Sequence, residues 1–194
     1  MKQTLPVMAA AILLAACSSA PRVEYGDPAD RETLTIDFGS TDLQMMAADM
    51  ASSMATGHLA ARTEKPVIFF GGVENATAEH IDMKSIADAV RTRIFTSGVA
   101  LVTADQSGLA EIQDQQDWQQ SGWVDAATAK EMGRLVGADM VLTGRLVSID
   151  KRAGRDRNLY YNFTMSLWDI QNGLLVWTEE KEIRKTSKKP LLGF

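Results

Sequence analysis

Asn158-Leu159-Tyr160-Tyr161-Asn162-Phe163-Thr164-Met165-Ser166-Leu167 is the stretch that decides the fold. Leu159, Tyr161, Phe163, Met165 and Leu167 alternate along it with more polar side chains. A period of two residues is typical of a strand with one face in the core and the other in water. An Asn-Gly pair ends the segment that follows, residues 169–173, and favours a hairpin turn. The sequence therefore predicts a half-buried strand over 158–167 that turns back into another strand.

The segments on either side of this stretch complete an antiparallel C-terminal sheet. Residues 140–149 are apolar enough for a strand, and residues 151–157 form a basic turn before the alternating stretch. The last strand begins at Leu174 and continues through a charged segment, residues 179–185. Charge discourages pairing between sheet edges, so this segment suits an edge strand. Residues 186–194 are predicted to be a tail.

The N-terminal half alternates short strands with helices. Apolar spacing and capping residues first predict a β-like piece over 34–38, a helix with Ser40 or Thr41 as its N-cap and Gly57 at its end, and a strand at 67–70. A helix over 81–96, with Ile86, Val90 and Ile94 inward, and a strand at 99–103 follow. Then come a helix within 104–121 anchored by Leu109, Ile112 and Trp118, and a helix over 126–136 capped by Asp125. Together these elements predict an α+β fold: a single domain with a mixed, mostly antiparallel sheet and helices packed mainly on one face.

The first of these helices is rich in methionine, with Met45, Met46, Met50 and Met54 near one another. Helical spacing favours a core stripe. Methionine side chains also repack easily, which leaves an adaptable partner-binding face as the alternative.

The start of the chain has the layout of an export signal. A short positive region with Lys2 precedes an apolar run that is too short to span a bilayer permanently. The run ends in Leu14-Ala15-Ala16-Cys17, and Cys17 is the only cysteine. This ending resembles the lipobox of bacterial lipoproteins, which implies that Cys17 is acylated and becomes the new N-terminus. A buried free cysteine behind an ordinary signal is the alternative.

The lipobox resemblance sets the expected organisation of the chain. We expect residues 1–16 to be a lipoprotein signal peptide, 17–32 a short lipid-anchored tether and 33–194 the globular domain. In similar lipoproteins an Asp after the cysteine tends to retain the protein at the inner membrane. Ser18 stands there, which favours the outer membrane and a domain that faces the periplasm.

Two basic clusters stand out against a formal net charge of −5, which itself argues against nucleic acid as a partner. Adjacent strands would bring the clusters together into one positive region that faces an acidic protein surface or anionic lipid. The candidate partner-binding residues are Arg145, Lys151, Arg152, Arg155, Arg157, Lys181, Arg184 and Lys185. The second cluster continues to Lys188 and Lys189.

The sequence offers no convincing catalytic, metal or cofactor site, and we expect no small-molecule substrate. His58 and His80 lie near helix ends, where exposed polar residues are common. Glu111, Asp114 and Asp117 share one face of a predicted helix, which is more typical of a solvated acidic stripe than of a catalytic or metal-binding pair. The sequence predicts a protein that is not an enzyme.

Several segments resemble the penicillin-binding-protein activator family LpoB. They are Asp42-Leu43-Gln44-Met45-Met46, Val73-Glu74-Asn75-Ala76-Thr77, residues 133–142 and residues 171–177. With the lipobox, the likeness extends over nearly the whole chain. It implies an outer-membrane lipoprotein that binds the small non-catalytic domain of a class A penicillin-binding protein and stimulates its transglycosylase and transpeptidase activities, thereby regulating peptidoglycan synthesis and cell shape.

This chain departs from the well-studied members of that family in two ways. Its tether is short, and its 151–157 loop and C-terminal tail are longer. The alternative function is that of an accessory lipoprotein in an outer-membrane secretion or surface-appendage assembly, since the curli secretion lipoprotein has a similar α/β core.

Overall fold

The computed structural model describes residues 25–31, 35–121, 123 and 137–188. The chain divides into two units, residues 1–30 and 31–194, and each is described by itself. In the first unit, Asp27 closes a turn by accepting a hydrogen bond from the Ala29 backbone N–H at 2.9 Å. All of the helices and strands below belong to the second unit.

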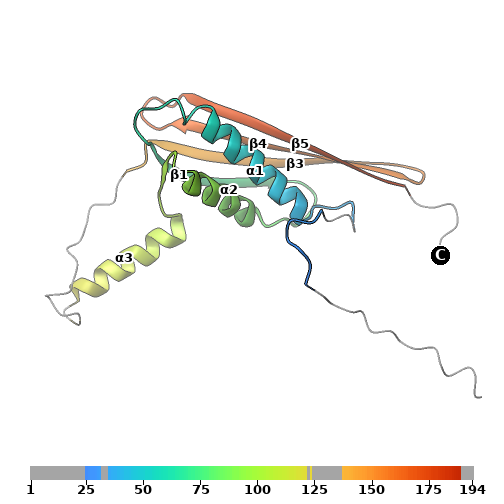
Figure 1. The fold of residues 1–194 in the computed structure, drawn as a ribbon. Helices are drawn as coiled ribbons and strands as arrows, with labels where there is room; N and C mark the ends of the chain where they lie inside the picture. Colours follow the sequence, from blue (N-terminus) through green and yellow to red (C-terminus); the bar gives the residue numbers. More distant parts are fainter. Residues whose placement is uncertain (1–24, 32–34, 122, 124–136, 189–194) are drawn as a thin grey trace, which may run out of the picture. The chain divides into compact units, whose positions relative to one another are not determined.

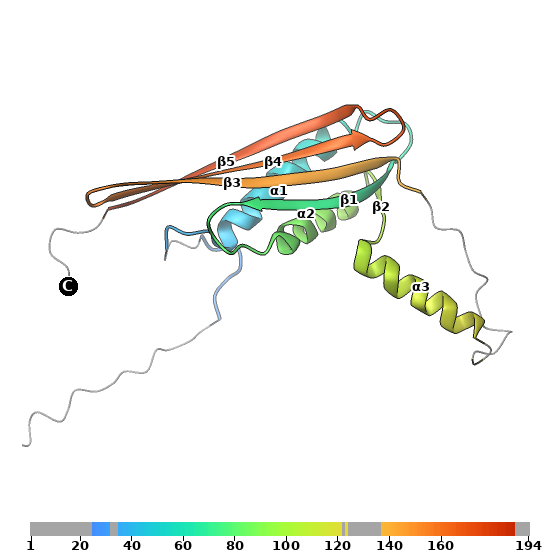
Figure 2. The ribbon, with the colours of Figure 1, turned by 180° about the vertical axis from the view of Figure 1, so that it is seen from behind.

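Five strands form one mixed sheet in the order β2-β1-β3-β4-β5 (Figures 1 and 2). The strands are β1 (Val67–Ala76), β2 (Leu101–Val102), β3 (Met140–Ala153), β4 (Asp156–Asp169) and β5 (Leu175–Lys188). β1 runs parallel to β2 and β3, whereas β3, β4 and β5 are successively antiparallel. The predicted α+β class, mixed sheet and C-terminal meander are confirmed.

Helices α1 (Ser40–Thr56) and α2 (Met83–Ser97) pack on one face of this sheet, here called the inner face (Figure 1). The apolar residues of β4 lie on that face: Leu159, Tyr161, Phe163, Met165 and Leu167 are all buried, as the alternation predicts. α2 contributes Ile86, Val90 and Ile94, which are completely buried. Side chains from both helices and from β1, β3, β4 and β5 therefore share one core.

The methionines of α1 belong mostly to the core. Met46, Met50 and Met54 are completely buried, and Met45 is partly buried beside them. The core interpretation is confirmed for these three side chains. Gly39 is the N-cap of α1, rather than the predicted Ser40 or Thr41, and its backbone N–H donates to the Asp42 carboxylate at 2.9 Å.

β1 is longer than predicted and does not end at Phe70. It passes through Gly71-Gly72 by a β-bulge, with a register shift between Phe70 and Gly72 against β3. Gly72 has φ +106°, in the region that favours glycine. A Cβ on Gly71 would lie 3.0 Å from the Val141 side chain. The glycines therefore allow the strand to continue through the bulge.

The structure corrects four other sequence predictions. Residues 35–38 form a bend rather than a β-like piece. Instead of strand pairing, the Phe38 backbone N–H donates to the Glu79 side chain, and the Asp37 carboxylate accepts from Arg157. β2 has only two residues. Residues 151–157 are mostly strand, with only Gly154-Arg155 between the paired residues Ala153 and Asp156. The strand also continues through residues 186–188, which pair with β4 instead of starting a tail.

α3 (Gln106–Gln120) confirms the predicted helix but not its anchors. Ile112 and Trp118 are 38% and 54% exposed, and Leu109 is only partly buried. The predicted 126–136 helix and its Asp125 cap lie outside the described residues. Among the described helices, none is both long and apolar enough to cross a bilayer.

Candidate partner-binding surface

The register divides the predicted basic residues between the two faces of the sheet. Residues that lie opposite each other on antiparallel strands share a face. Arg152 lies opposite Arg157, Phe163 opposite Lys181 and Leu159 opposite Lys185, so these four basic side chains share the inner face with the buried residues of β4. Arg145, Lys151 and Arg184 lie on the opposite, outer face. The two clusters therefore do not merge as a whole into one positive surface, because their members lie on opposite faces of the sheet.

The inner-face lysines of β5 bind α1. Lys181 forms an ion pair with Asp49, and Lys185 forms one with the carboxylate of Asp42, a residue that is 2% exposed. Lys185 also donates to the Asp37 carbonyl oxygen at 2.7 Å. A buried carboxylate needs such a partner, because desolvation of an unpaired charge is strongly unfavourable. These lysines therefore fix α1 on the sheet edge.

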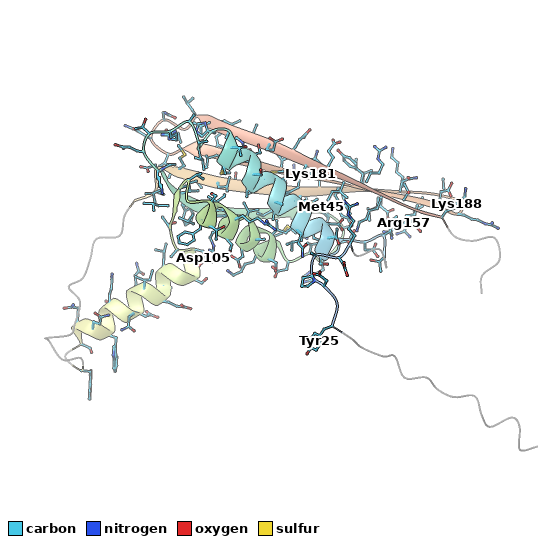
Figure 3. All side chains as sticks on the ribbon, in the orientation of Figure 1. Tyr25, Met45, Asp105, Arg157, Lys181 and Lys188 are labelled. Carbon is cyan, nitrogen blue, oxygen red and sulfur yellow. The ribbon has the colours of Figure 1, made fainter. Side chains whose placement is uncertain are left out.

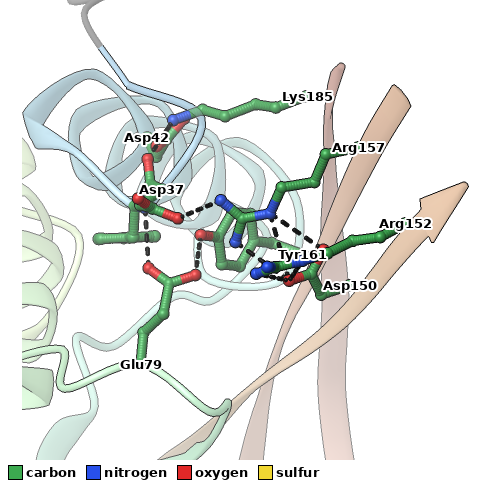
Figure 4. Close-up of polar contacts among 9 residues, drawn as sticks. Asp37, Asp42, Glu79, Asp150, Arg152, Arg157, Tyr161 and Lys185 are labelled. Atoms are coloured by element: carbon green, nitrogen blue, oxygen red, sulfur yellow. Dashed lines mark hydrogen bonds and ion pairs between the residues drawn. The ribbon is translucent and has the colours of Figure 1, made fainter. Parts of the chain in front are cut away.

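The base of the β3–β4 hairpin carries a second network, shown in Figure 4. Arg157 donates to Asp150 through Nε at 3.1 Å and to Asp37 through Nη1 at 2.8 Å, and Arg152 donates to Asp150 at 2.8 Å. Hydrogen bonds from Arg157 and Arg152 lower the pKa of Asp150 to about 2. The same carboxylates raise the pKa of Arg157. Both arginines are therefore occupied within the fold.

Tyr161 links this region to the loop before α2. Its hydroxyl donates to Glu79 Oε1 at 2.5 Å, and Glu79 Oε2 accepts the Phe38 backbone N–H at 3.0 Å. The Phe38 ring meets the Tyr161 ring edge-on, with centroids 5.6 Å apart. Burial and the adjacent Glu79 carboxylate raise the pKa of Tyr161. The residues before α1 are thereby held against the middle of β4.

Four exposed basic residues remain at the far end of the sheet: Lys151, Arg155, Arg184 and Lys188. We call them the basic tip. The Arg184 guanidinium lies 5.8 Å from the centroid of the Tyr160 ring, and Lys188 lies 4.0 Å from Asp156. Figure 3 shows Lys188 near this end of the strands. A hollow of about 640 Å³ lies on its outer face, lined in part by Lys151, Tyr160 and Arg184.

The other predicted candidates lie elsewhere. Arg145 forms an ion pair with Glu74 at 3.2 Å in the middle of the outer face.

The histidines and the acidic stripe of α3 do not form a site. His80 is exposed. His58 is partly exposed, and its partial burial lowers its pKa. Glu111, Asp114 and Asp117 are exposed on α3. Within the described residues, no three His, Cys, Asp or Glu side chains are placed to hold a metal ion. Cys17 and Lys189 lie outside the described residues.

Comparison with known proteins now identifies the family. The family model of the peptidoglycan-synthase activator LpoB matches residues 42–183. This chain belongs to the LpoB family. The family is one of lipoprotein activators that regulate peptidoglycan synthesis rather than of enzymes. The match does not favour the secretion-assembly alternative.

Solved structures with a similar fold include two LpoB C-terminal domains. The domain from Salmonella enterica is 16% identical, with a TM-score of 0.45, and the alignment covers 74% of this chain and 99% of that one. The domain from Escherichia coli is 17% identical, with a TM-score of 0.43 and coverage of 73% and 98%. Lipoprotein GNA1162 from Neisseria meningitidis is 16% identical, with a TM-score of 0.41 and coverage of 63% and 84%. No curated protein sequence matches.

Sequence reasoning identified the basic residues but not the acids that pair with them. Asp37, Asp42, Asp49 and Asp150 lack a distinctive local pattern. One signal was present in β5, where Lys181 and Lys185 flank the apolar Ile183 at a spacing of two. That spacing places both lysines on the face of Ile183, which is buried.

Proposed function

We propose that this LpoB-family protein is anchored in the outer membrane through acylated Cys17, binds a class A penicillin-binding protein and activates it. The observation that carries the proposed binding mode is the basic tip. Its residues are exposed at the end of the sheet, whereas Arg157, Lys181 and Lys185 are less exposed and paired with acids of the same fold, and the exposed Arg152 is paired with Asp150. The tip is therefore the part of the predicted basic surface that remains suited to an acidic partner.

The basic tip is also held in a defined position. Its residues lie on β3, on β5 and in the β3–β4 turn. They are next to the Arg157–Asp150 network, which ties the β3–β4 hairpin to the segment before α1. A rigid charged surface speeds association with a complementary partner and orients it. Activation would follow if the tip binds the active conformation of the synthase more tightly than the inactive one.

A reconstituted polymerisation reaction tests this proposal. The full-length chain is added in detergent to a purified class A synthase and its lipid-linked precursor, and the rate of glycan formation is followed. We expect the wild-type protein to raise that rate. The double variant Lys151→Glu, Arg155→Glu should associate with the synthase more slowly, by roughly tenfold or more. It should therefore raise the rate of glycan formation less than the wild type does.

Lys65→Glu is the matched control, because Lys65 is an exposed lysine in the loop before β1. It should stimulate like the wild type. Equal stimulation by the double variant would exclude the basic tip, and no stimulation of any class A synthase by the wild type would exclude the function itself.

The proposed anchor is tested separately in cells. Labelled palmitate should enter the wild-type chain and not a Cys17→Ser variant, and the wild type should fractionate with outer membranes. Equal labelling of the two chains would contradict acylation at Cys17.

A further inference from the structure

The outer face of the sheet contains a second hollow, a polar groove that shares no lining residue with the hollow at the basic tip. Its volume is about 780 Å³, and it runs over β1, β3 and β4. The lining residues that the argument uses are Gly72, Thr143, Asn162, Thr164 and Ser166. Gly72 has open space where a Cβ would stand, so the groove is unobstructed at the bulge of β1.

Hydrogen bonds hold the polar side chains along this groove in fixed orientations. The Thr164 hydroxyl donates to Asn162 Oδ1 at 3.0 Å, and Asn162 Nδ2 donates to Glu180 at 3.2 Å. Ser166 and Thr178 share a hydrogen bond at 3.3 Å. Each hydroxyl can accept in addition to donating, so lone pairs remain for a ligand. Asn162 and Ser166 stand ~13 Å apart along one strand, which gives an extended row of such groups.

An aromatic ring lies beside this row. The Trp168 indole N–H donates to Thr143 Oγ1 at 3.2 Å, which orients the ring on the outer face, and Trp168 is 37% exposed. Indole presents a large, rigid apolar surface at little loss of conformational entropy on binding.

The charge on the groove lining restricts the ligand. Its only charged residues are Glu74 and Arg145, which pair with each other at 3.2 Å. A lining without net charge offers little attraction to a strongly acidic or basic partner. Hydroxyl and amide groups in a row, together with an exposed indole, instead match a ligand that carries many hydroxyl groups and has apolar ring faces.

We propose that this outer groove binds an uncharged stretch of a β-linked glycan strand of N-acetylated sugars. The choice of sugar rests on the proposed function, since the polymer that a peptidoglycan synthase makes has a β-linked backbone of N-acetylated sugars, and the uncharged stretch meant here is that backbone. The groove would hold the strand through Thr143, Asn162 and Thr164, with a sugar ring against Trp168. Because the groove shares no lining residue with the hollow at the basic tip, the protein could contact the synthase and its product at the same time.

Nuclear magnetic resonance of the full-length chain tests the groove without any synthase. The chain is held in a detergent that lacks sugar, and chitohexaose is the probe. We expect titration to shift the Trp168 indole N–H signal and the amide signals of Gly72 and Ser166. Trp168→Ala should weaken binding, followed at those amides, by roughly three- to tenfold, and Thr143→Val should also weaken it.

Trp118→Ala is the matched control, because Trp118 is an exposed tryptophan on α3. It should leave the affinity unchanged. The absence of shifts at these signals, or unchanged affinity in Trp168→Ala and Thr143→Val, would overturn the proposal. In a second titration, with the synthase in place of chitohexaose, shifts at these signals that chitohexaose does not cause would assign the groove to protein binding and would also overturn the proposal. Because the polymerisation reaction measures stimulation separately, either proposal can fail without the other.

Discussion

Arg157 reaches Asp37 across 120 positions of the sequence, with Nη1 donating to Oδ1 at 2.8 Å. The same guanidinium binds Asp150 on β3. One side chain therefore joins the segment that enters the domain to the β3–β4 hairpin, which carries Lys151 and Arg155 of the basic tip (Figure 4). A bond of this kind closes a long loop of chain, so its effect extends beyond the two residues that it joins.

Replacing Arg157 by Gln should release the segment before α1. We expect a lower melting temperature and faster amide hydrogen exchange over residues 35–39, measured by mass spectrometry. Arg155→Gln is the control, because Arg155 lies in the same hairpin and forms no ion pair within the described part of the chain. Unchanged hydrogen exchange over residues 35–39 in Arg157→Gln would show that the hydrogen bond from the Phe38 backbone N–H to Glu79 suffices to hold this segment.

Asp150 should make the stability of the hairpin sensitive to acid. Its arginine partners lower its pKa from 3.8 to about 2 in the folded protein. A carboxyl group whose folded pKa lies below its unfolded value stabilises the fold above the unfolded value, and this contribution is lost as the pH falls through the folded value. Asp150→Asn should therefore be less stable than the wild type at neutral pH.

The difference in the free energy of unfolding should shrink between about pH 4 and about pH 2. Urea unfolding at several pH values measures it. Asp114→Asn, on the exposed face of α3, is the control and should match the wild type throughout. A difference that persists at pH 2 would mean that Asp150 acts through packing rather than through its charge.

The parts of the fold that follow one local period could be predicted from the sequence. The alternation over 158–167 correctly placed every buried residue of β4, and the spacing of Ile86, Val90 and Ile94 correctly placed the inner face of α2. In both elements the burial of apolar surface dominates, and the pattern records it directly.

The predictions failed where a residue's role depends on a distant partner. Charge on β5 indicated a solvated edge, yet Lys181 and Lys185 bind Asp49 and Asp42 on α1. The apolar run predicted a strand at 67–70, yet β1 continues past Phe70 through a bulge against β3. The acids and the bulge are explained by tertiary contacts, and no local spacing encodes those contacts.

Tyr161 should make the protein sensitive to alkali. Burial and Glu79 raise its pKa, so the folded protein keeps the proton at a pH where the unfolded chain, with a pKa of about 10, has lost it. The wild type should therefore lose stability as the pH rises above about 10. Tyr161→Phe should lose less over that range, although it should be less stable at pH 7 by about 1–3 kcal/mol because the Glu79 bond is gone.

Circular dichroism during urea unfolding at neutral and alkaline pH measures both effects. Tyr25→Phe is the control, because Tyr25 is fully exposed. If the wild type and Tyr161→Phe lose the same amount of stability at alkaline pH, the sensitivity to alkali belongs to groups other than Tyr161.

The methionines of α1 permit a test of the core interpretation against the partner-face alternative. Met50 is completely buried, so Met50→Ala removes core volume and should lower the free energy of unfolding by about 2–5 kcal/mol. Met45 is only partly buried, so Met45→Ala should lower it less. Thermal and urea unfolding measure both values.

The stimulation of the synthase, measured below the melting temperature of each variant, separates the two interpretations. If the helix only builds the core, both variants should stimulate like the wild type once corrected for the folded fraction. A loss of stimulation in Met45→Ala with little loss of stability would instead place this helix at the partner interface, because a side chain can then matter to binding without mattering to the fold.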